Sequence, residues 1–227
     1  MHANREVTLF HSPQTRSTGA LILLEELSAA YALQLLDMRG RQEQRQPAYL
    51  AINPMGKVPA IRHGDAVVTE QVAIFIYLAD LYPEAGLAPL IGDPLRGPYL
   101  RWMAFYGSCF EPAIIDRFMK REAAPTGTSP YGDFATVLST LLGQLSQGPY
   151  FLGERFTAVD VLWGQGLGWI LQSGLVPPSD LLNAYVARVN ARPAVVRALA
   201  KDVELSVAQQ AAAAKLSAAA QSAAVRN

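Results

Sequence analysis

The first part of the chain alternates strand-like and helical segments, and the remainder shows no such alternation. Residues 7–10 form a β-rich run, a polar turn follows over 11–15, and apolar residues at helical spacing run from Leu21 to Leu27. A second strand is expected over 33–38. The simplest connection of these segments is a βαβ unit with a parallel strand pair, which predicts an α/β domain.

The rest of this first domain is expected to complete a small sheet. The predicted segments are a polar loop over 39–46, a short helix at 49–50, a hairpin of strands 58–61 and 66–68, and a helix over 70–82. The last helix ends at Pro83, because the residue before a proline disfavours helical geometry. The predicted order over residues 1–82 is therefore βαβαββα.

Residues 83–94 contain several prolines and glycines, a composition typical of a linker between domains. Beyond them we expect an all-helical domain over 95–205, with Pro112 kinking its first helix. The expected helices cover 95–120, 134–147, 158–172, 180–190 and 194–203. The alanine-rich end, 206–227, favours a helix but has too little bulky apolar surface to specify a docking face, so it is predicted to fray or protrude.

Charge and cysteine content exclude several classes of protein. Nineteen Lys and Arg balance nineteen Asp and Glu, so the basic excess of a nucleic-acid binder is missing. The single cysteine, Cys109, excludes an internal disulfide and a multi-cysteine zinc site, and the three histidines lack metal-ligand spacing. No run of about eighteen apolar residues occurs. We expect a cytoplasmic protein without a membrane anchor, a nucleic-acid partner or a bound metal.

Two motifs carry a family resemblance. The segment 53–60 (NPMGKVPA), followed by 68–74 (VTEQVAI) and 77–80 (YLAD), closely resembles the glutathione-binding half of cytosolic glutathione transferases, with bacterial beta-class members nearest. The segment 154–160 (ERFTAVD) is similar to the helix-capping segment of the family's helical second domain. The resemblance covers nearly the whole chain and implies a thioredoxin-like N-terminal domain, an all-α C-terminal domain and a homodimer.

The resemblance also implies where glutathione binds. A cis bond between Val58 and Pro59 would leave the backbone of Val58 free to pair with the cysteinyl part of the peptide as an added strand. Glu70 and Gln71 begin a helix whose free N–H groups favour the γ-glutamyl carboxylate, and Glu70 would hold the γ-glutamyl ammonium. Without the neighbouring Val-Pro motif, the simpler interpretation of Glu70 is a first-turn acid that stabilises its own helix. The family commonly has serine where this chain has Gln71.

The glycyl carboxylate has two groups of candidate partners. Lys57 follows the turn before the Val-Pro motif, and Arg41 or Gln42 lies in the polar loop. Each would offer a cation or an amide to the carboxylate.

The reactive end of the site has no cysteine. Arg16 stands where beta-class enzymes have their active-site cysteine, which argues against mixed-disulfide chemistry and leaves Arg16 as a source of positive field. Comparison with the serine-using classes favours Ser12 when aligned on the helix start and the neighbourhood of Thr15 when aligned on the strand. Ser17 is a further hydroxyl, and the alternative role of Thr15 and Ser17 is to cap the helix.

A strong base is not required for the thiolate. Half-ionising a thiol of pKa near 8.5 at pH 7 needs about 2 kcal/mol. A hydroxyl hydrogen bond to a charged group supplies about 1.5–3 kcal/mol, and a helix N-terminus adds about 0.3–1 kcal/mol. One serine or threonine at the start of the helix is therefore sufficient.

Other patterns indicate structure more than chemistry. Thr157 and Asp160 are spaced as a capping box, and Gly164, Gly166 and Gly168 indicate close helix packing. Several aromatic residues lie along 102–118, and the resemblance implies that this helix lines the electrophile pocket, with Tyr106 and Phe110 as candidates.

The sequence therefore predicts a glutathione transferase that conjugates the glutathione thiolate to a small hydrophobic electrophile. Glutathione-dependent isomerisation, dehalogenation or peroxide reduction are alternatives on the same site. A non-catalytic glutathione-binding module is the alternative from a different class of protein. The apolar residues of the pocket do not identify the electrophile.

Overall fold

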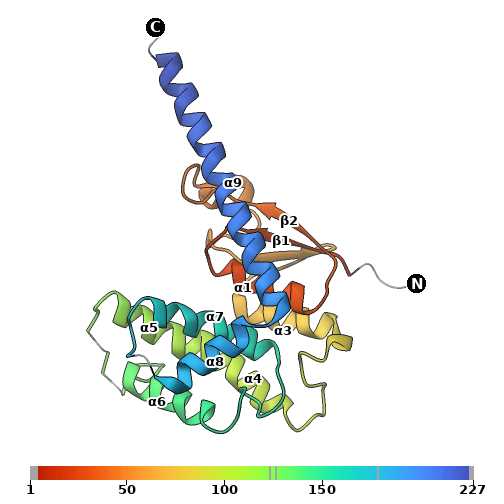
Figure 1. Ribbon diagram of the computed structural model, residues 1–227, viewed down its shortest axis with the longest axis vertical. Helices are drawn as coiled ribbons and strands as arrows, with labels where there is room; N and C mark the ends of the chain where they lie inside the picture. Colours follow the sequence, from red (N-terminus) through yellow and green to blue (C-terminus); the bar gives the residue numbers. More distant parts are fainter. Residues whose placement is uncertain (1–4, 123, 126, 178, 225–227) are drawn as a thin grey trace.

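The protein consists of a small α/β domain, a cluster of helices beside it, and a long last helix that runs along both (Figure 1). The computed structural model describes residues 5–122, 124–125, 127–177 and 179–224. Helices α1 and α3 lie between the sheet and the remaining helices (Figure 1). The predicted two-part architecture, α/β followed by all-α, is confirmed.

The N-terminal domain has a 4-stranded sheet in the order β2-β1-β3-β4. Its strands are β1 (Val7–His11), β2 (Tyr31–Leu35), β3 (Ala60–His63) and β4 (Ala66–Val68). Strand β2 is parallel to β1, whereas β3 is antiparallel to β1 and β4 is antiparallel to β3. The parallel pair and the hairpin predicted from the sequence are both present.

Strand β2 begins and ends earlier than predicted. The expected range was 33–38, but β2 pairs Tyr31 with Val7 and Leu35 with His11, and it stops where β1 stops. Leu36 donates the last N–H of the ladder to the His11 carbonyl at 2.8 Å, and its side chain packs in a second apolar cluster with Phe10 and Tyr49. The periodicity of the apolar residues therefore does not mark this boundary, because burial continues after the strand pairing has ended.

Helices cover both faces of the sheet. Helices α1 (Ser17–Glu26) and α3 (Gln71–Leu81) cover one face, where Val7 and Leu9 are fully buried. The short α2 (Pro47–Leu50), preceded by the 3-10 turn η1 (Glu43–Arg45), covers the other face through Tyr49, which meets Phe10 edge-on. Because both faces are covered, β1 carries apolar residues at successive positions.

The C-terminal part is built from helices. Its elements are the 3-10 turn η2 (Pro83–Ala85), α4 (Arg96–Phe105), the π-helical segment η3 (Tyr106–Phe110), α5 (Glu111–Phe118), α6 (Phe134–Leu145), α7 (Ala158–Gln172), α8 (Asp180–Asn190) and α9 (Pro193–Ala224). Within the described ranges, no helix is long and apolar enough to cross a membrane.

The single helix expected over 95–120 is divided by the π-helical segment η3. Pro112 follows this segment, and in a regular α-helix its ring would clash with the carbonyl of Ser108. The N–H of Glu111 instead donates to the carbonyl of Tyr106, five residues earlier, which widens the helix at this point. The helix is irregular near Pro112, as predicted, but the irregularity is a π-helical turn before the proline.

Helix α9 continues well past the predicted end at 203. The tail was expected over 206–227, of which 225–227 lie outside the described residues, and its part 206–224 is the continuation of the same helix to Ala224. Alanine has the highest helix propensity, so the helix persists where it leaves the rest of the molecule (Figure 1). The first half of α9 packs against α1 and thereby joins the two parts of the chain.

Two structural motifs predicted from the sequence are present. Asp160 accepts the N–H of Thr157 at 2.9 Å and completes the capping box at the start of α7. A Cβ at Gly164 or Gly166 would come within 2.6 Å of Val189 or 2.7 Å of Tyr106. These glycines therefore permit close helix packing, as expected.

Candidate functional site

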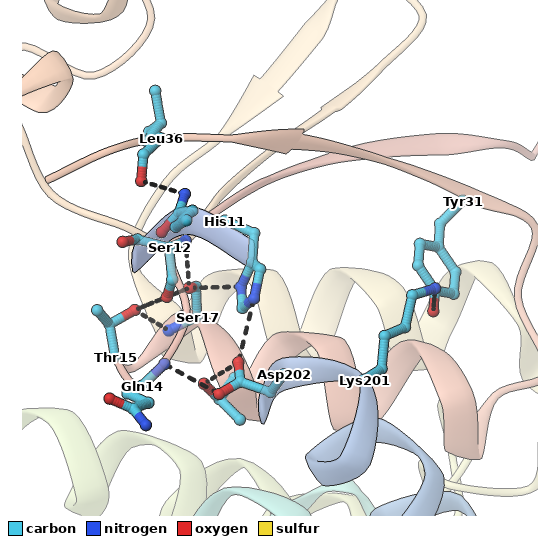
Figure 2. Close-up of polar contacts among 11 residues, drawn as sticks. His11, Ser12, Gln14, Thr15, Ser17, Tyr31, Leu36, Lys201 and Asp202 are labelled. Atoms are coloured by element: carbon cyan, nitrogen blue, oxygen red, sulfur yellow. Dashed lines mark hydrogen bonds and ion pairs between the residues drawn. The ribbon is translucent and has the colours of Figure 1, made fainter. Parts of the chain in front are cut away.

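The turn between β1 and α1 carries a cluster of hydroxyl groups. Ser17 Oγ lies 2.8 Å from Thr15 Oγ1, 3.0 Å from the carbonyl oxygen of Ser12 and 3.1 Å from the Ser12 nitrogen. Thr15 Oγ1 lies 2.7 Å from the same Ser12 carbonyl and accepts the N–H of Ser17 at 3.2 Å. Gln14 has a φ of 58°, a conformation uncommon for a residue with a side chain. Figure 2 shows these groups converging at the start of α1.

Helix α9 holds this turn from the other side. Asp202 accepts the N–H of Gln14 at 3.0 Å and the hydroxyl of Thr18 at 2.8 Å. Its Oδ1 also lies 3.1 Å from Nε2 of His11, although the ring N–H is not well aligned with it. Burial opposes ionisation of Asp202, but the contacts with His11, Thr18 and Gln14 outweigh it and hold the pKa of this carboxyl below its usual value.

His11 connects Asp202 to the hydroxyl cluster. Its side chain is completely buried, and Nδ1 lies 2.8 Å from Ser17 Oγ. The side chains therefore form a continuous chain from a carboxylate on α9 to the hydroxyls of the turn (Figure 2).

A cavity of about 730 Å³ opens beside this turn. Its lining residues come from the turn, α1, α3, η3, α5, α7, α8 and α9. Four predicted site residues line this cavity, namely Thr15, Arg16, Gln71 and Tyr106. Many of the other lining side chains are polar, including Gln14, Glu111, Gln165, Gln172, Asn190 and Asp202. A ligand in this cavity would meet amides and hydroxyls as well as the aromatic groups of Tyr106 and Trp169.

Ser12 and Phe110 are among the predicted site residues that lie outside this cavity. Ser12 is buried and lines a smaller cavity of about 90 Å³ between the turn, the loop after β2 and α9. Phe110 is 3% exposed and packs against Trp163 and Tyr106, so it supports the cavity wall from behind. Of the two hydroxyls that the sequence leaves as candidates, only that of Thr15 borders the larger cavity.

The hydroxyls of Thr15 and Ser17 contribute little to capping the N-terminus of α1. The cap position of α1 is Arg16, whose side chain makes no capping hydrogen bond. Thr15 accepts only the N–H of the first helical residue, Ser17. The capping role considered for Thr15 and Ser17 is therefore partial, and the hydroxyl proton of Thr15 is not needed for it.

Arg16 bridges the two parts of the molecule. Its Nε donates to Oε1 of Glu111 on α5 at 2.5 Å, and the Arg16 side chain is half exposed. Glu111 partly neutralises the positive field that the sequence assigns to Arg16. The pair also fixes one rim of the cavity, because its members come from α1 and α5.

Tyr106 contributes a protonated hydroxyl to the cavity. Burial raises its pKa far above the ordinary value, so it remains a neutral donor at physiological pH. Gly166 on α7 leaves room for the Tyr106 ring, since a Cβ there would lie 2.8 Å from its hydroxyl oxygen. The glycine that the sequence marks for helix packing thus also shapes the cavity.

The Val-Pro motif adopts the predicted conformation. The bond between Val58 and Pro59 is cis, and the backbone of Val58 forms no hydrogen bond with any residue that the structure describes. Tyr49 Oη and Asn53 Nδ2 donate to the preceding carbonyl of Lys57 at 2.6 and 2.9 Å. The motif is therefore held from one side, and the backbone of Val58 remains available to a ligand.

Strand register locates this motif relative to the hydroxyl turn. Phe10 on β1 pairs with Ala60 on β3 in the antiparallel ladder. Continuing that register by two residues sets Val58 opposite Ser12. The motif and the turn thus lie at the same end of the sheet.

Glu70 and Gln71 stand at the start of α3. Glu70 has φ 64° and ψ 119°, a strained conformation for a residue with a side chain. Its exposed carboxylate pairs with no other residue in the described part of the chain. Gln71 directs its amide nitrogen to the carbonyl of Arg16 at 3.3 Å, while its Oε1 is buried and finds no partner among the described residues.

Arg41 is already engaged on the protein surface. It lies 3.7 Å from a carboxylate oxygen of Asp37 and 3.6 Å from one of Glu43. In the described ranges, no group of three or more His, Cys, Asp or Glu side chains is arranged to hold a metal ion.

Sequence reasoning missed three residues at this site. His11 was considered only as a metal ligand, and Asp202 and Glu111 were not singled out. Asp202 meets Gln14 across a separation of 188 residues, which no local pattern reports. His11 directly before Ser12 was the one available signal.

Comparisons with known proteins agree with this geometry. The family model for the glutathione S-transferase N-terminal domain matches residues 5–80. The chain is 29% identical over 203 residues to glutathione S-transferase PARB of Nicotiana tabacum, covering 84% of this chain and 94% of that protein.

The chain is also similar to solved structures of glutathione transferases. A glutathione transferase from Methylococcus capsulatus superposes with a TM-score of 0.71 at 29% identity, covering 86% of this chain and 98% of its own. A sphingomonad glutathione S-transferase in complex with glutathione gives a TM-score of 0.70, also at 29% identity and with the same coverage.

Proposed function

The chain belongs to the glutathione transferase family, and from this premise we propose that it binds glutathione beside the 12–17 turn and transfers the thiolate to an electrophile in the 730 Å³ cavity. The hydroxyl of Thr15 is proposed to donate to the sulfur. The observation that carries the proposal is the position of this hydroxyl, which lines the cavity at the N-terminal end of α1.

Three features support a peptide ligand in this position. The unpaired backbone of Val58 suits an extended cysteinyl segment. The γ-glutamyl carboxylate is proposed to meet the free N–H groups of α3, and the γ-glutamyl ammonium to meet the Glu70 carboxylate and Gln71 Oε1. The glycyl carboxylate is assigned to Lys57 and, after release from its acidic neighbours, Arg41. The sphingomonad relative in complex with glutathione supports the same class of ligand.

The proposed chemistry is nucleophilic attack by the thiolate on the electrophile. The Thr15 hydrogen bond and the α1 N-terminus together supply the roughly 2 kcal/mol that half-ionisation of the thiol needs at pH 7. Tyr106 is a neutral donor on the cavity wall, suited to a developing negative charge on the electrophile or leaving group. The polar lining favours an electrophile that carries hydrogen-bonding groups beside its apolar part.

The test combines calorimetry with a conjugation assay. Wild-type protein should bind glutathione and conjugate it to at least some members of a panel of activated aryl halides, enones and epoxides. Thr15→Val should keep binding and lose most of the conjugation. Binding without thiolate formation or turnover in wild type would contradict the proposal and favour a non-catalytic module. Isomerase, dehalogenase or peroxidase turnover without conjugation would replace the transfer step.

We further propose a homodimer, because the family resemblance implies one. Light scattering at micromolar concentration should give twice the chain mass of 24.6 kDa. A monomer at that concentration would contradict this part of the proposal.

A further inference from the structure

We propose that buried His11 receives the thiol proton of glutathione through the hydroxyls of Thr15 and Ser17, and that Asp202 stabilises the resulting imidazolium. This inference rests on the proposed function, because it needs a thiol beside Thr15. It adds a proton acceptor and assigns a role in the reaction to helix α9.

Consecutive contacts connect the groups. Thr15 Oγ1 is 2.8 Å from Ser17 Oγ, Ser17 Oγ is 2.8 Å from His11 Nδ1, and His11 Nε2 is 3.1 Å from Asp202 Oδ1. Thr15 borders the cavity, whereas His11 and Ser17 are completely buried. The two hydroxyls therefore connect the cavity to Nδ1 of the imidazole, while Asp202, which also lines the cavity, faces Nε2 (Figure 2).

The protonation states follow from counting donors and acceptors. Asp202 is ionised at neutral pH, so it only accepts, and the neighbouring Nε2 of His11 carries the ring proton. Nδ1 of a neutral His11 is then an acceptor, and Ser17 is the donor that faces it at 2.8 Å. With the Ser17 proton on that bond, Ser17 Oγ accepts from the Ser12 N–H, and the Thr15 hydroxyl faces two acceptors, the Ser12 carbonyl at 2.7 Å and Ser17 Oγ at 2.8 Å. When the Thr15 hydroxyl turns from the Ser12 carbonyl to Ser17 Oγ, all donors in the chain point from the cavity toward His11.

The proton transfer is balanced. The S–H bond breaks, and its proton forms a bond to Thr15 Oγ1. The original Thr15 proton moves to Ser17 Oγ, and the Ser17 proton moves to Nδ1. Both hydroxyls are regenerated, and the products are a thiolate in the cavity and an imidazolium beside the Asp202 carboxylate. After the S–C bond forms, the proton returns along the same hydroxyls to the leaving group or to water.

The surroundings of His11 suit this role. A thiol holds its proton about two pKa units more tightly than an imidazole in water, so the transfer needs a nearby negative charge on the imidazole side. Asp202 is that charge. The neighbouring cation on α9, Lys201, is directed to the hydroxyl of Tyr31 at 2.9 Å, and the α1 groups near Asp202, Ser17 and Thr18, are uncharged.

Transfer to His11 differs from simple ionisation of the thiol in where the thiol proton goes. If His11 accepts it, glutathione forms a thiolate without releasing that proton to the solvent. If no group in the protein accepts it, each thiolate releases one proton. The number of protons released is measured by calorimetry of binding in buffers of different ionisation enthalpy. S-methylglutathione, which has no thiol proton, gives the contribution of all other groups and is subtracted.

For wild type at pH 7, we expect ultraviolet thiolate absorbance and a thiol-specific proton release near zero. A release close to one proton per thiolate would overturn the proposal, and this count stands even if a variant fails to fold. Binding with no thiolate absorbance at all would instead contradict the proposed function, so the two failures are distinguishable.

His11→Gln keeps a polar side chain in the buried site but removes the proton acceptor. We expect its bound thiolate at pH 7 to fall about tenfold or more, with each remaining thiolate now releasing a proton. His63→Gln is the matched control, since it makes the same substitution at the end of β3, where the ring contacts the Tyr77 hydroxyl at 2.7 Å. It should behave as wild type. Wild-type thiolate and proton count in His11→Gln would show that the imidazole is not the acceptor.

Discussion

Asp160 and Asp202 are both buried carboxylates that hold the backbone near the start of a helix, but their surroundings differ. Asp160 accepts hydrogen bonds from the N–H groups of Phe151 and Thr157 and from the Tyr185 hydroxyl, all within the helical part. Asp202 binds a turn of the other domain and lines the 730 Å³ cavity. We call the network around Asp160 closed, because it lies within the helical part, and the network around Asp202 open, because it also borders the cavity.

The pKa values of the two carboxyls shift in opposite directions. Burial raises the pKa of Asp160 to about 6, even though its hydrogen bonds favour the charged form. At Asp202 burial acts in the same direction, but the contacts with His11, Thr18 and Gln14 prevail and lower the pKa. Asp202 therefore stays ionised to a lower pH than Asp160, and it is the carboxylate that borders the cavity.

The largest expected effect is on folding, at the closed network. Asp160→Ala leaves four buried donors without their carboxylate acceptor, the N–H groups of Phe151 and Thr157 and the hydroxyls of Thr157 and Tyr185, and each unsatisfied group costs about 1–3 kcal/mol. We expect a loss of at least about 3 kcal/mol in the free energy of unfolding, measured with urea. The folded fraction should keep its glutathione affinity. A loss below about 1 kcal/mol would show that the network does not stabilise the fold.

The next effect concerns the open network. Thr15→Val keeps the shape of the side chain and removes the hydroxyl, so kcat/KM for conjugation should fall roughly 10- to 100-fold, equivalent to about 1.5–3 kcal/mol. The free energy of unfolding should change by no more than about 1 kcal/mol. Ser12→Ala is the control and should have the smaller effect, because Ser12 does not line the cavity. A larger effect at Ser12 would reverse the assignment.

Glutathione binding provides the third prediction. Glu70→Gln removes the charge that faces the γ-glutamyl ammonium, and the dissociation constant measured by calorimetry should rise by about tenfold or more. Asp65→Asn removes an exposed acid from the turn between β3 and β4 and should leave the affinity unchanged. Equal affinities for wild type and Glu70→Gln would exclude the proposed contact.

The smallest effect is a pH dependence. The pKa of Asp202 is lowered by folding, so its carboxylate contributes stability above the unfolded value of about 3.9, and this contribution is lost as the pH falls through the lower folded value. Asp202→Asn should therefore be less stable than wild type at pH 7, by about 1–2 kcal/mol from its hydrogen bonds. Urea unfolding should show the gap narrowing below about pH 4. A gap that stays constant to pH 2 would contradict the ionised state assigned to Asp202.

Local patterns predicted much of the fold. Strand β1, the hairpin, helix α3 and the capping box follow from apolar periodicity, turn residues and short-range capping, all of which lie within a few residues of one another. The end of β2 and the π-helical segment η3 were not predicted. The first depends on pairing with β1, and the second on how the chain accommodates Pro112.

The candidate site was predictable to a smaller extent. The sequence identified Thr15, Gln71 and Tyr106, which line one cavity. It left Ser12 and Thr15 undecided, since both hydroxyls follow β1 within a few residues and their orientation depends on the turn. It missed Asp202 because that contact requires α9 to pack against α1.

Titration of the bound thiol tests the central claim most directly. Thiolate absorbance of the glutathione complex is followed against pH in wild type and Thr15→Val. We predict a thiol pKa at least about one unit below the free value of about 8.5 in wild type, and a rise of about one unit or more in the variant. An identical pKa in both proteins would contradict the account and assign thiolate stabilisation to backbone amides or Ser17.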